Sequence, residues 1–238
     1  METLRTCARE IAHSIEGHRG RGYSGDRPTQ YHLDVEADRA GLKVLIGSGM
    51  RVVSEESGVS GHGPVTVVID PIDGSTNCDR GVPFYSTSLA ALVNGELVAA
   101  LVSNLATGTL FEAEAGSGAT RDGVPIHPSS STTIAGSIVS FSGLPSHHAG
   151  WAQLRVLGSA SLECCLVADG SLDLFAVAQR STLHSWDYLA GLLIATEAGA
   201  VAADYEGRAL VIDTNESRRP VFAATSGLLT AALDLGPL

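Results

Sequence analysis

The apolar run VTVVID (65–70) constrains the fold more than any other segment of the chain. Its nearly unbroken hydrophobic character is typical of a strand that is buried on both faces, because a strand with one face in water alternates apolar and polar side chains. Such a strand needs other layers of structure against both faces, which favours a layered α/β protein. The run ends in Asp70, and the polar, turn-forming residues 71–77 follow it.

The order of the expected elements agrees with a layered α/β sandwich. Two helices come first, at residues 1–20 and 34–47, and strands follow at 65–70, 86–94, 96–103, 109–115 and 136–141. The Asn94-Gly95 dipeptide predicts a tight hairpin, and the RDG segment at 121–123 predicts a further turn. The second half alternates: helix 160–169, strand 173–178, helix 186–199, strands 201–205 and 221–225, and a final helix.

The segment SGLPSHHAG (142–150) is polar and rich in turn-forming residues, and it marks the expected boundary between two parts. Residues 1–142 would form an N-terminal α+β subdomain, and residues 143–238 a C-terminal α/β subdomain. A chain of 238 residues is long enough to bury a substantial core in this arrangement.

Composition excludes several classes of protein. The net charge of −11, with only 15 Lys and Arg, argues against a general nucleic-acid binder, which needs a basic face. No apolar run approaches the about 18 residues of a membrane span, and the N-terminus lacks the apolar core of a signal peptide, so a cytoplasmic protein without a membrane partner is expected. The four cysteines show no CxxC spacing, which argues against a zinc site or a disulfide framework.

Two carboxylates in the segment DPIDGSTN (70–77) point to a metal site. Pro71 fixes the backbone and Gly74 relieves strain, so that Asp70 and Asp73 can both turn inward although they are three residues apart. Carboxylates this close repel each other, and one would take up a proton unless a cation lay between them. Mg²⁺, a hard cation that prefers oxygen ligands and often shares a phosphate with the protein, meets this need.

The residues after the second aspartate suit an anion. Ser75, Thr76 and Asn77 are typical helix N-cap residues, so a helix or a single helical turn is expected to begin here. The free N–H groups and the positive end of such a helix favour a bound anion. Metal-binding carboxylates and an anion-binding helix start on one short segment predict a site for a phosphate ester.

Two further acidic segments complete the expected site. SEESG (54–58) places Glu55 and Glu56 ahead of the buried strand, and Asp187 stands in the first turn of an apolar helix. Taken singly, a pair of glutamates is typical of a solvated loop, and an aspartate in a first helical turn is typical of a cap. Their occurrence together, in this order, favours a catalytic site.

Three segments resemble, in chain order, signatures of the inositol monophosphatase family, which are magnesium-dependent, lithium-sensitive phosphomonoesterases. DPIDGSTN resembles the family's DPIDGTxN, SEESG its GEES, and WDYLAGLLIATEAGA (186–200) its WDxAAGxxIxxEAGG. Three ordered motifs of this length make the match specific. The resemblance implies a layered αβαβα sandwich of the inositol monophosphatase and fructose-1,6-bisphosphatase type, usually a homodimer.

The resemblance also implies a role for each matched residue, with two or three Mg²⁺ ions in the site. The first ion would be bound by Glu55, Asp70 and the Ile72 carbonyl, and the second by Asp70, Asp73 and Asp187. A third, weaker ion would lie near Glu55. Ser75, paired with Asp38, would activate the attacking water. The remaining matched residues would contact phosphate or substrate: Gly74, Ser75, Thr76, Gly158, Ser159, Ala160 and Arg180.

Departures from the family pattern concern the substrate more than the reaction. Arg180 stands where the inositol enzymes carry a glutamate that contacts substrate hydroxyls, and an arginine suits a second phosphate or a carboxylate, unless it is simply a surface residue. Tyr188 replaces a small residue of the signature, which is expected to reshape the pocket. The segment between Asp38 and Glu55 is also short for the family.

Three functions remain open at this point. The first is a Mg²⁺-dependent phosphatase of a small phosphate ester, such as an inositol phosphate, a sugar phosphate or bisphosphate, or histidinol phosphate. The second is a 3′-phosphonucleotide phosphatase acting on adenosine 3′,5′-bisphosphate, which Arg180 favours. The third is a regulatory or binding protein that retains the fold, although nucleic acid is not expected as the main partner of so acidic a chain.

Overall fold

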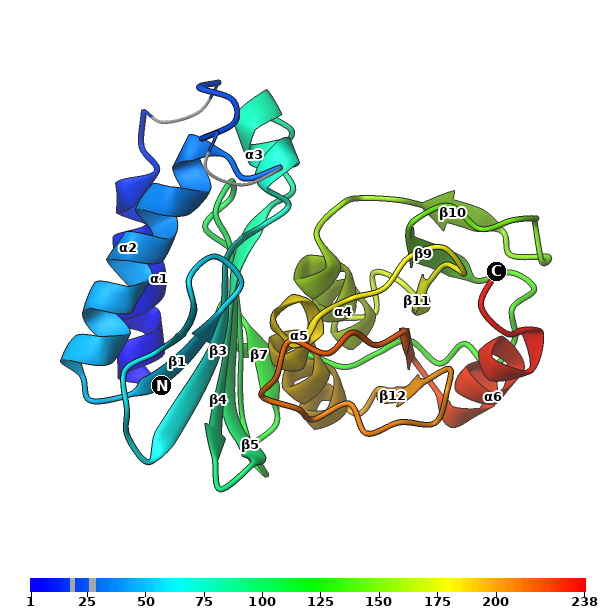
Figure 1. Ribbon diagram of the computed structural model, residues 1–238. Coiled ribbons are helices and arrows are strands. Elements are labelled where there is room, and N and C mark those ends of the chain that lie inside the picture. Colours follow the sequence, from blue (N-terminus) through cyan, green and yellow to red (C-terminus); the bar gives the residue numbers. More distant parts are fainter. Residues whose placement is uncertain (18–19, 26–28) are drawn as a thin grey trace.

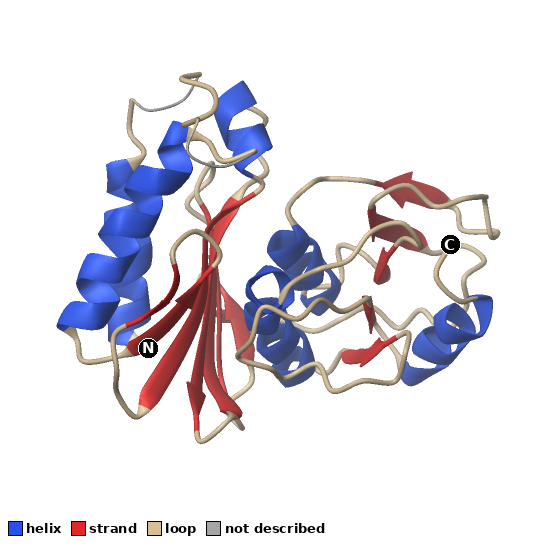
Figure 2. Ribbon diagram, viewed as in Figure 1, coloured by secondary structure: helices blue, strands red, loops and turns tan. Residues whose placement is uncertain are grey.

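Two β-sheets alternate with layers of helix through the molecule (Figures 1 and 2). The structure, a computed structural model, describes residues 1–17, 20–25 and 29–238. The first sheet has the strand order β2-β1-β3-β4-β5-β6-β7-β8. Its strands are β1 (Arg51–Ser54), β2 (Gly58–Ser60), β3 (Val65–Asp73), β4 (Ser86–Val93), β5 (Glu96–Asn104), β6 (Leu110–Glu114), β7 (Ala119–Arg121) and β8 (Val124–Pro125).

The second sheet is smaller and has the order β10-β9-β11-β13-β12. Its strands are β9 (Ile138–Ser142), β10 (Gln153–Arg155), β11 (Leu174–Val177), β12 (Val201–Asp204) and β13 (Pro220–Ala223). The helices are α1 (Glu2–Ser14), α2 (His32–Gly47), α3 (Ser75–Arg80), α4 (Ala160–Ala168), α5 (Ser185–Ala198) and α6 (Ser226–Leu235).

Strand β3 is buried on both faces, as its sequence predicts. Val67 and Ile69 pack toward the cluster that α1 and α2 form with one face of the first sheet, whereas Val68 packs into the cluster of α4 and α5 on the other face. These residues are at most 1 % exposed, and each buried side chain of this kind contributes about 1.5–3 kcal/mol. α1 and α2 therefore form one outer layer, and α4 and α5 form the middle layer (Figure 1).

The middle and far layers complete the sandwich. α5 contacts strands of both sheets, which explains why its sequence is apolar on nearly every side. α6 covers the opposite face of the second sheet, where Leu228 and Ala232 pack against β13 and its neighbours. The order helix, sheet, helix, sheet, helix confirms the predicted αβαβα sandwich.

Local turn signals agree with the structure. Val93 pairs with Glu96 across Asn94 and Gly95, both of which have positive φ (51° and 84°), as a tight hairpin requires. The turn at 121–123 joins β7 to β8 in the same way. The first helix ends earlier than expected, at Ser14, and residues 18–19 of the expected range lie outside the described residues.

The expected boundary at residues 142 and 143 does not coincide with the change of sheet. β9 pairs with β10 and β11, so it belongs to the second sheet although it precedes residue 143. By sheet membership the chain passes from one sheet to the other between β8 and β9. The division into two subdomains itself remains a prediction.

All four cysteines are buried thiols that form no disulfide: Cys7 on α1, Cys78 on α3, and Cys164 with Cys165 on α4. Each packs as a small hydrophobic residue in a core cluster, as expected for Cys164 and Cys165. Burial raises the pKa of Cys7 to about 12. Among the described helices, none is both long enough and apolar enough to cross a membrane.

Candidate active site

The segment after Asp70 is a bulge inside β3 rather than a turn at the end of a strand. Asp70 pairs with Ser88 of β4 and Asp73 pairs with Ser86, so three steps along β3 match two along β4. Side chains alternate along a regular strand, and residues three apart would face opposite ways. The extra residue of the bulge puts both aspartates on the same side of the sheet. Pro71, which lacks an N–H, lies beyond the last residue of β3 paired with β1, Ile69.

Three carboxylates from distant parts of the chain meet at this bulge. Glu55, Asp70 and Asp187 each offer one oxygen, and these oxygens lie within 4.8 Å of one another. Glu55 follows β1 and is exposed, Asp70 is buried, and Asp187 is half-buried in the first turn of α5. The structure therefore brings together three of the four carboxylates that the sequence assigns to metal binding.

The electrostatics of the cluster oppose ionisation. Burial, followed by the charges of Glu55, Asp73 and Asp187, raises the pKa of Asp70 well above its usual value. Burial and the charges of Glu55 and Asp73 likewise raise the pKa of Asp187. A divalent cation removes this penalty, because it favours the charged form of every carboxylate around it.

The donor set of the cluster fits Mg²⁺. It consists of carboxylate oxygens, which are hard ligands, and the ionisation of these carboxylates is opposed without a cation. Glu55 of this cluster also lines an open cavity. Ile72, whose carbonyl the sequence assigns to the first ion, is buried between the two aspartates, and its N–H donates to Asp70 Oδ1 (3.0 Å).

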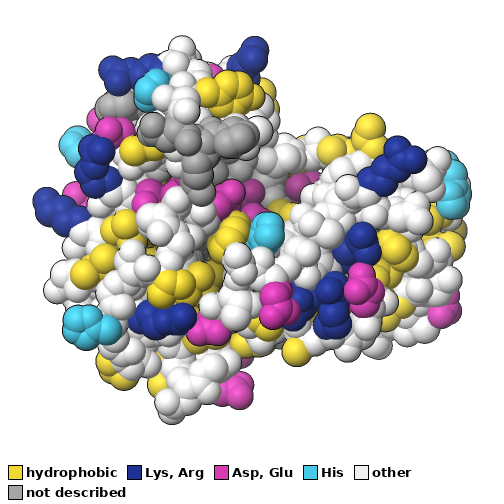
Figure 3. All heavy atoms as spheres, viewed as in Figure 1, with side chains coloured by type: hydrophobic (Ala, Val, Ile, Leu, Met, Phe, Trp, Pro, Cys, Tyr) yellow, Lys and Arg dark blue, Asp and Glu magenta, His cyan; other side chains and the backbone are white. Residues whose placement is uncertain are grey.

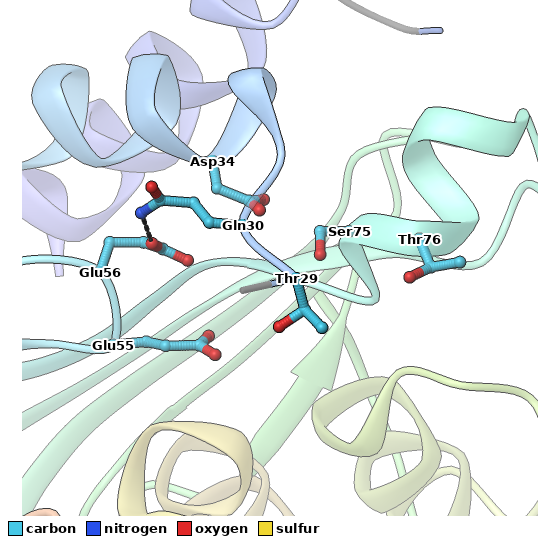
Figure 4. A pocket seen from close by; sticks show the side chains of 7 residues that line it. All are labelled: Thr29, Gln30, Asp34, Glu55, Glu56, Ser75 and Thr76. Atoms are coloured by element: carbon cyan, nitrogen blue, oxygen red, sulfur yellow. Dashed lines mark hydrogen bonds between the residues drawn. The ribbon is translucent and has the colours of Figure 1, made fainter. Parts of the chain in front are cut away.

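An open cavity of about 450 Å³ adjoins the carboxylate cluster (Figure 4). Side chains from the chain before α2, from α2, from the β1–β2 turn and from the start of α3 line it: Thr29, Gln30, Asp34, Glu55, Glu56, Ser75 and Thr76. Gln30 Nε2 donates to Glu56, which joins two sides of the cavity. Acidic side chains gather on this face where the two halves of the molecule meet (Figure 3).

Asp34, rather than Asp38, lies in the cavity with Ser75. The sequence pairs Asp38 with Ser75, but Asp38 lies one turn further along α2 and accepts a hydrogen bond from Ser54 Oγ (2.6 Å). Ser54 Oγ in turn accepts from the N–H of Glu56 (3.1 Å), so Asp38 supports the turn that carries the glutamates. The short spacing between Asp38 and Glu55 is the feature of the sequence that sets Asp38 apart from the family pattern.

The carboxyl of Asp34 is buried and held in place. Its Oδ2 accepts from the N–H of Tyr31 (2.8 Å), which closes the first turn of α2. Oδ1 is a buried atom without a well-formed hydrogen bond among the described residues, although the Ser75 hydroxyl is near enough to lower the pKa. Burial outweighs these contacts and, with the charges of Glu56 and Glu55, raises the pKa of Asp34 to about 8.

Asp73 lies outside the group of three carboxylates and caps helix α4. Its Oδ2 accepts from the N–H of Ser161 (2.7 Å), and its Oδ1 from the N–H of Ala160 (3.3 Å). A strand of the first sheet thus supplies the acceptor that the N-terminus of a middle-layer helix needs. Burial raises the pKa of Asp73, against the lowering effect of these bonds.

The predicted substrate residues at 158–160 lie against residues 74–76, which the sequence predicts to contact phosphate. Gly74 has φ +88°, and a Cβ there would come within 2.7 Å of the Gly158 carbonyl, so no larger residue fits. Asn77 Nδ2 donates to the carbonyls of Phe84 and Leu157 (both 2.8 Å), which ties the two segments together. Ser159 Oγ donates to Asp73 rather than pointing into the cavity (2.8 Å).

Two predicted specificity residues do not line the cavity. Arg180 is exposed in the turn after β11, and it is not among the described residues around the cavity. Tyr188 is fully buried, and its hydroxyl donates to the Leu210 carbonyl (2.8 Å). The larger residue at this signature position therefore fills the core beside α5, and the expected change of pocket shape is not seen there.

Asp187 is both a cap and a member of the cluster. Its Oδ2 accepts from the N–H of His184 (2.6 Å), as in a capping box, while an oxygen of the same carboxylate faces Glu55 and Asp70. The capping bond fixes the carboxylate at the mouth of the helix. The sequence leaves open whether Asp187 is a helix cap or a metal ligand, and this geometry allows it to be both.

Comparisons with known proteins identify the family of the chain. The model of the inositol monophosphatase family matches residues 33–234. A fructose-1,6-bisphosphatase/inositol-1-monophosphatase of Archaeoglobus fulgidus is 37% identical over 181 residues, which cover 74% of this chain and 71% of that protein. A Nus factor SuhB of Xylella fastidiosa is 31% identical over 170 residues, covering 66% of this chain and 61% of that protein.

A solved structure gives the same result for the fold. A protein from Pyrococcus horikoshii, described as having similarities to inositol-1 monophosphatase, superposes with a TM-score of 0.86 at 25% identity, and the match covers 98% of each chain. Sequence motifs, family match and fold thus agree over nearly the whole chain. The chain belongs to the inositol monophosphatase family, and it is a phosphoric monoester hydrolase.

Proposed function

We propose that the protein hydrolyses a small phosphate monoester, of the inositol monophosphate or sugar phosphate type, with Mg²⁺ as its cofactor. The observation that carries this proposal is the meeting of Glu55, Asp70 and Asp187 beside an open cavity at the start of α3. The residues that would hold two or three ions are Glu55, Asp70, the Ile72 carbonyl, Asp73 and Asp187. When bound, the cations supply Lewis-acid activation of water and stabilise the departing oxygen.

The chain's own residues would place the phosphate. The N–H groups at the start of α3 have no partners one turn earlier in the helix, and Ser75 and Thr76 line the cavity there. Thr76 Oγ1 lies 3.1 Å from the hydroxyl of Tyr31. This hydrogen bond holds the Thr76 side chain at the edge of the cavity. Glycine at position 74 lets the backbone approach the 158–160 segment closely.

Asp34 and Ser75 would orient the attacking water and take its proton. Both residues line the cavity, and the Asp34 carboxyl points toward the side from which Ser75 comes (Figure 4). Oδ1 of Asp34 has an unused lone pair in a buried position, and a buried carboxylate with a pKa near working pH is suited to accept a proton. Ser75 supplies the same hydroxyl as the threonine of the family signature. Asp34 replaces Asp38 in the proposed catalytic set, beside Glu55 and Ser75.

The pair Asp34→Asn and Asp38→Asn tests this exchange of roles. Asp34→Asn is expected to lower kcat by about 10²–10⁴-fold at saturating Mg²⁺, the usual range for loss of a general base. Asp38→Asn keeps an oxygen for the Ser54 hydroxyl and is expected to affect kcat far less. Steady-state kinetics on both variants, with Mg²⁺ titrated, measures the difference. Equal losses in the two variants would contradict the assignment.

Phosphate release from a panel of esters tests the proposed activity. The panel comprises inositol 1-phosphate, fructose 1,6-bisphosphate, histidinol phosphate and adenosine 3′,5′-bisphosphate, each with Mg²⁺ and with EDTA. We expect Mg²⁺-dependent release from at least one ester and none with EDTA. Preference for the nucleotide would favour the 3′-phosphonucleotide phosphatase, and no release from any ester would refute the proposal.

Other properties implied by the resemblance remain predictions. These are inhibition by lithium, a homodimer and a cytoplasmic location. A regulatory role remains the alternative to catalysis, and a relative named as a Nus factor keeps it open. The group of Glu55, Asp70 and Asp187 and the net charge of −11 favour catalysis.

A further inference from the structure

One oxygen of Asp73 is much more strongly held than the other. Oδ2 accepts three short hydrogen bonds, from Ser159 Oγ (2.8 Å), Ser161 N (2.7 Å) and Ser161 Oγ (2.6 Å). Oδ1 accepts one long bond, from the N–H of Ala160 (3.3 Å). A carboxylate oxygen offers about two lone-pair directions, so Oδ2 is saturated and Oδ1 retains a free direction.

A third serine lies behind the two that donate to Asp73. Ser86 is paired with Asp73 in the β3–β4 ladder, and its Oγ lies 2.8 Å from Ser161 Oγ and 3.0 Å from Ser159 Oγ. Ser86, Ser159 and Ser161 are all fully buried, and we name them the serine cluster. Each hydroxyl has one proton. Those of Ser159 and Ser161 are directed at Asp73, so Ser86 donates to one of them and holds its orientation.

Capping of α4 does not require this cluster. The N–H groups of Ala160 and Ser161 are satisfied by Asp73 without any hydroxyl. Burying three hydroxyls costs free energy unless each gains a partner, and hydrogen bonds to a charged acceptor are the stronger ones. The serine cluster is therefore not needed to cap α4. Its hydroxyls of Ser159 and Ser161 both donate to Oδ2 of Asp73.

We propose that the serine cluster positions Asp73 for metal binding, by fixing Oδ2 so that Oδ1 is the oxygen available to the cation. This inference rests on the proposed function, since Asp73 is a ligand only if the site binds a metal. Ser159, assigned to the substrate by the sequence, acts through Asp73 instead. The three serines are positioning residues and touch neither substrate nor metal.

Metal affinity of the EDTA-treated protein tests the proposal. Ser161→Ala and Ser86→Ala are each expected to weaken Mg²⁺ binding by about tenfold or more, as loss of a hydrogen bond to a ligand does. Isothermal titration calorimetry with Mg²⁺ alone gives the affinity, and the rise in Tm with Mg²⁺ checks it. Ser137→Ala is the matched control: Ser137 is also buried, but its Oγ donates to the Thr133 carbonyl.

A double-mutant cycle separates positioning from general loss of packing. In the Asp73→Asn background, Ser161→Ala should cause no further loss of Mg²⁺ affinity. Unchanged affinity in both single serine variants, or an undiminished effect of Ser161→Ala without the Asp73 carboxylate, would overturn the proposal. Ser86→Ala leaves every donor to Asp73 in place, so it carries the test if Ser161→Ala does not fold.

The same measurements distinguish failure of the inference from failure of the proposed function. A parent protein that binds Mg²⁺ but releases phosphate from no ester would refute the function, while the affinity comparison between parent and serine variants would still decide the inference. A parent protein that binds no Mg²⁺ would refute both.

Discussion

Asp70→Asn is expected to lower kcat by on the order of 10³-fold or more at saturating Mg²⁺, with the fold retained. Asp70 lies at the centre of the site: Glu55, Asp73 and Asp187 all contribute to its raised pKa. The amide keeps an oxygen for the Ile72 N–H but removes the charge that a cation needs. Loss of one charge-stabilising group in an active site costs about 10²–10³-fold, and a shared metal ligand is expected to exceed this.

Stability of the Asp70→Asn variant gives the control for folding. Without metal, the parent carries a buried carboxyl whose ionisation is opposed, and the neutral amide avoids that penalty. The metal-free variant should therefore have a Tm at pH 8 at least equal to that of the parent, while the rise in Tm on adding Mg²⁺ should largely disappear. Asp169→Asn is the matched control, because Asp169 pairs with Arg121 outside the site. Activity of Asp70→Asn near that of Asp169→Asn would contradict the metal site.

Glu163→Gln is expected to remove a large part of the pH dependence of stability in the metal-free protein. Glu163 lies on α4 and is 1 % exposed. It accepts hydrogen bonds from Ser140 and from the N–H of Leu157 (3.2 Å), which holds the start of the 158–160 segment. Burial raises the pKa of Glu163 from 4.5 to about 7.

The direction of the effect follows from proton binding. The folded protein keeps a proton on Glu163 that the unfolded chain has lost, so this stabilisation is complete below pH 4.5 and is lost as the pH rises through 7. A shift of this size corresponds to about 3 kcal/mol. Glutamine remains neutral and retains an acceptor for both donors. The gain in stability of the variant over the parent should be smallest near pH 5 and largest at pH 8.

Urea unfolding in EDTA at pH 5, 6, 7 and 8 measures this difference. Burial also raises the pKa of Asp34, to about 8, so the parent alone cannot assign the slope to one residue. The difference between parent and Glu163→Gln isolates the contribution of Glu163. Parallel profiles for the two proteins would show that Glu163 ionises as readily in the folded state as in the unfolded chain.

The parts of the fold that were predicted correctly depend on local patterns. The Asn94-Gly95 hairpin requires only two residues that tolerate positive φ, and the burial of 65–70 follows from its composition. Short strands such as β1 and β10 carry too few residues to show a period, and they form because a neighbouring strand pairs with them. β9 was placed in the first part because its sheet is decided by pairing with β11, more than 30 residues later.

The candidate site also has residues that local motifs predict and residues that only long-range contacts decide. Glu55, Asp70 and Asp187 were identified from motifs, and the structure brings them together. Asp34 and Asp38 lie one turn apart on α2, and sequence spacing on a helix does not say which of the two reaches the cavity. The choice depends on how the first turn of α2 meets α3, a long-range contact.

The partners of Asp73 could not have been predicted either. Ser159 and Ser161 are 86 and 88 residues away in the chain, and their role follows from the packing of α4 against the bulge in β3. Serines in a helix N-terminal segment are ordinary cap residues. Only the direction of their hydroxyls, toward a carboxylate of another element, sets them apart.

Reaction of the four buried thiols can be used to follow partial unfolding of the protein. Cys7 lies in the outer helical layer, Cys78 on α3, and Cys164 with Cys165 in the middle layer. Burial raises the pKa of Cys7, Cys164 and Cys165, so these thiols react with alkylating reagents only after the layer around them opens. The order in which reagents label the four positions therefore records the order in which the layers separate.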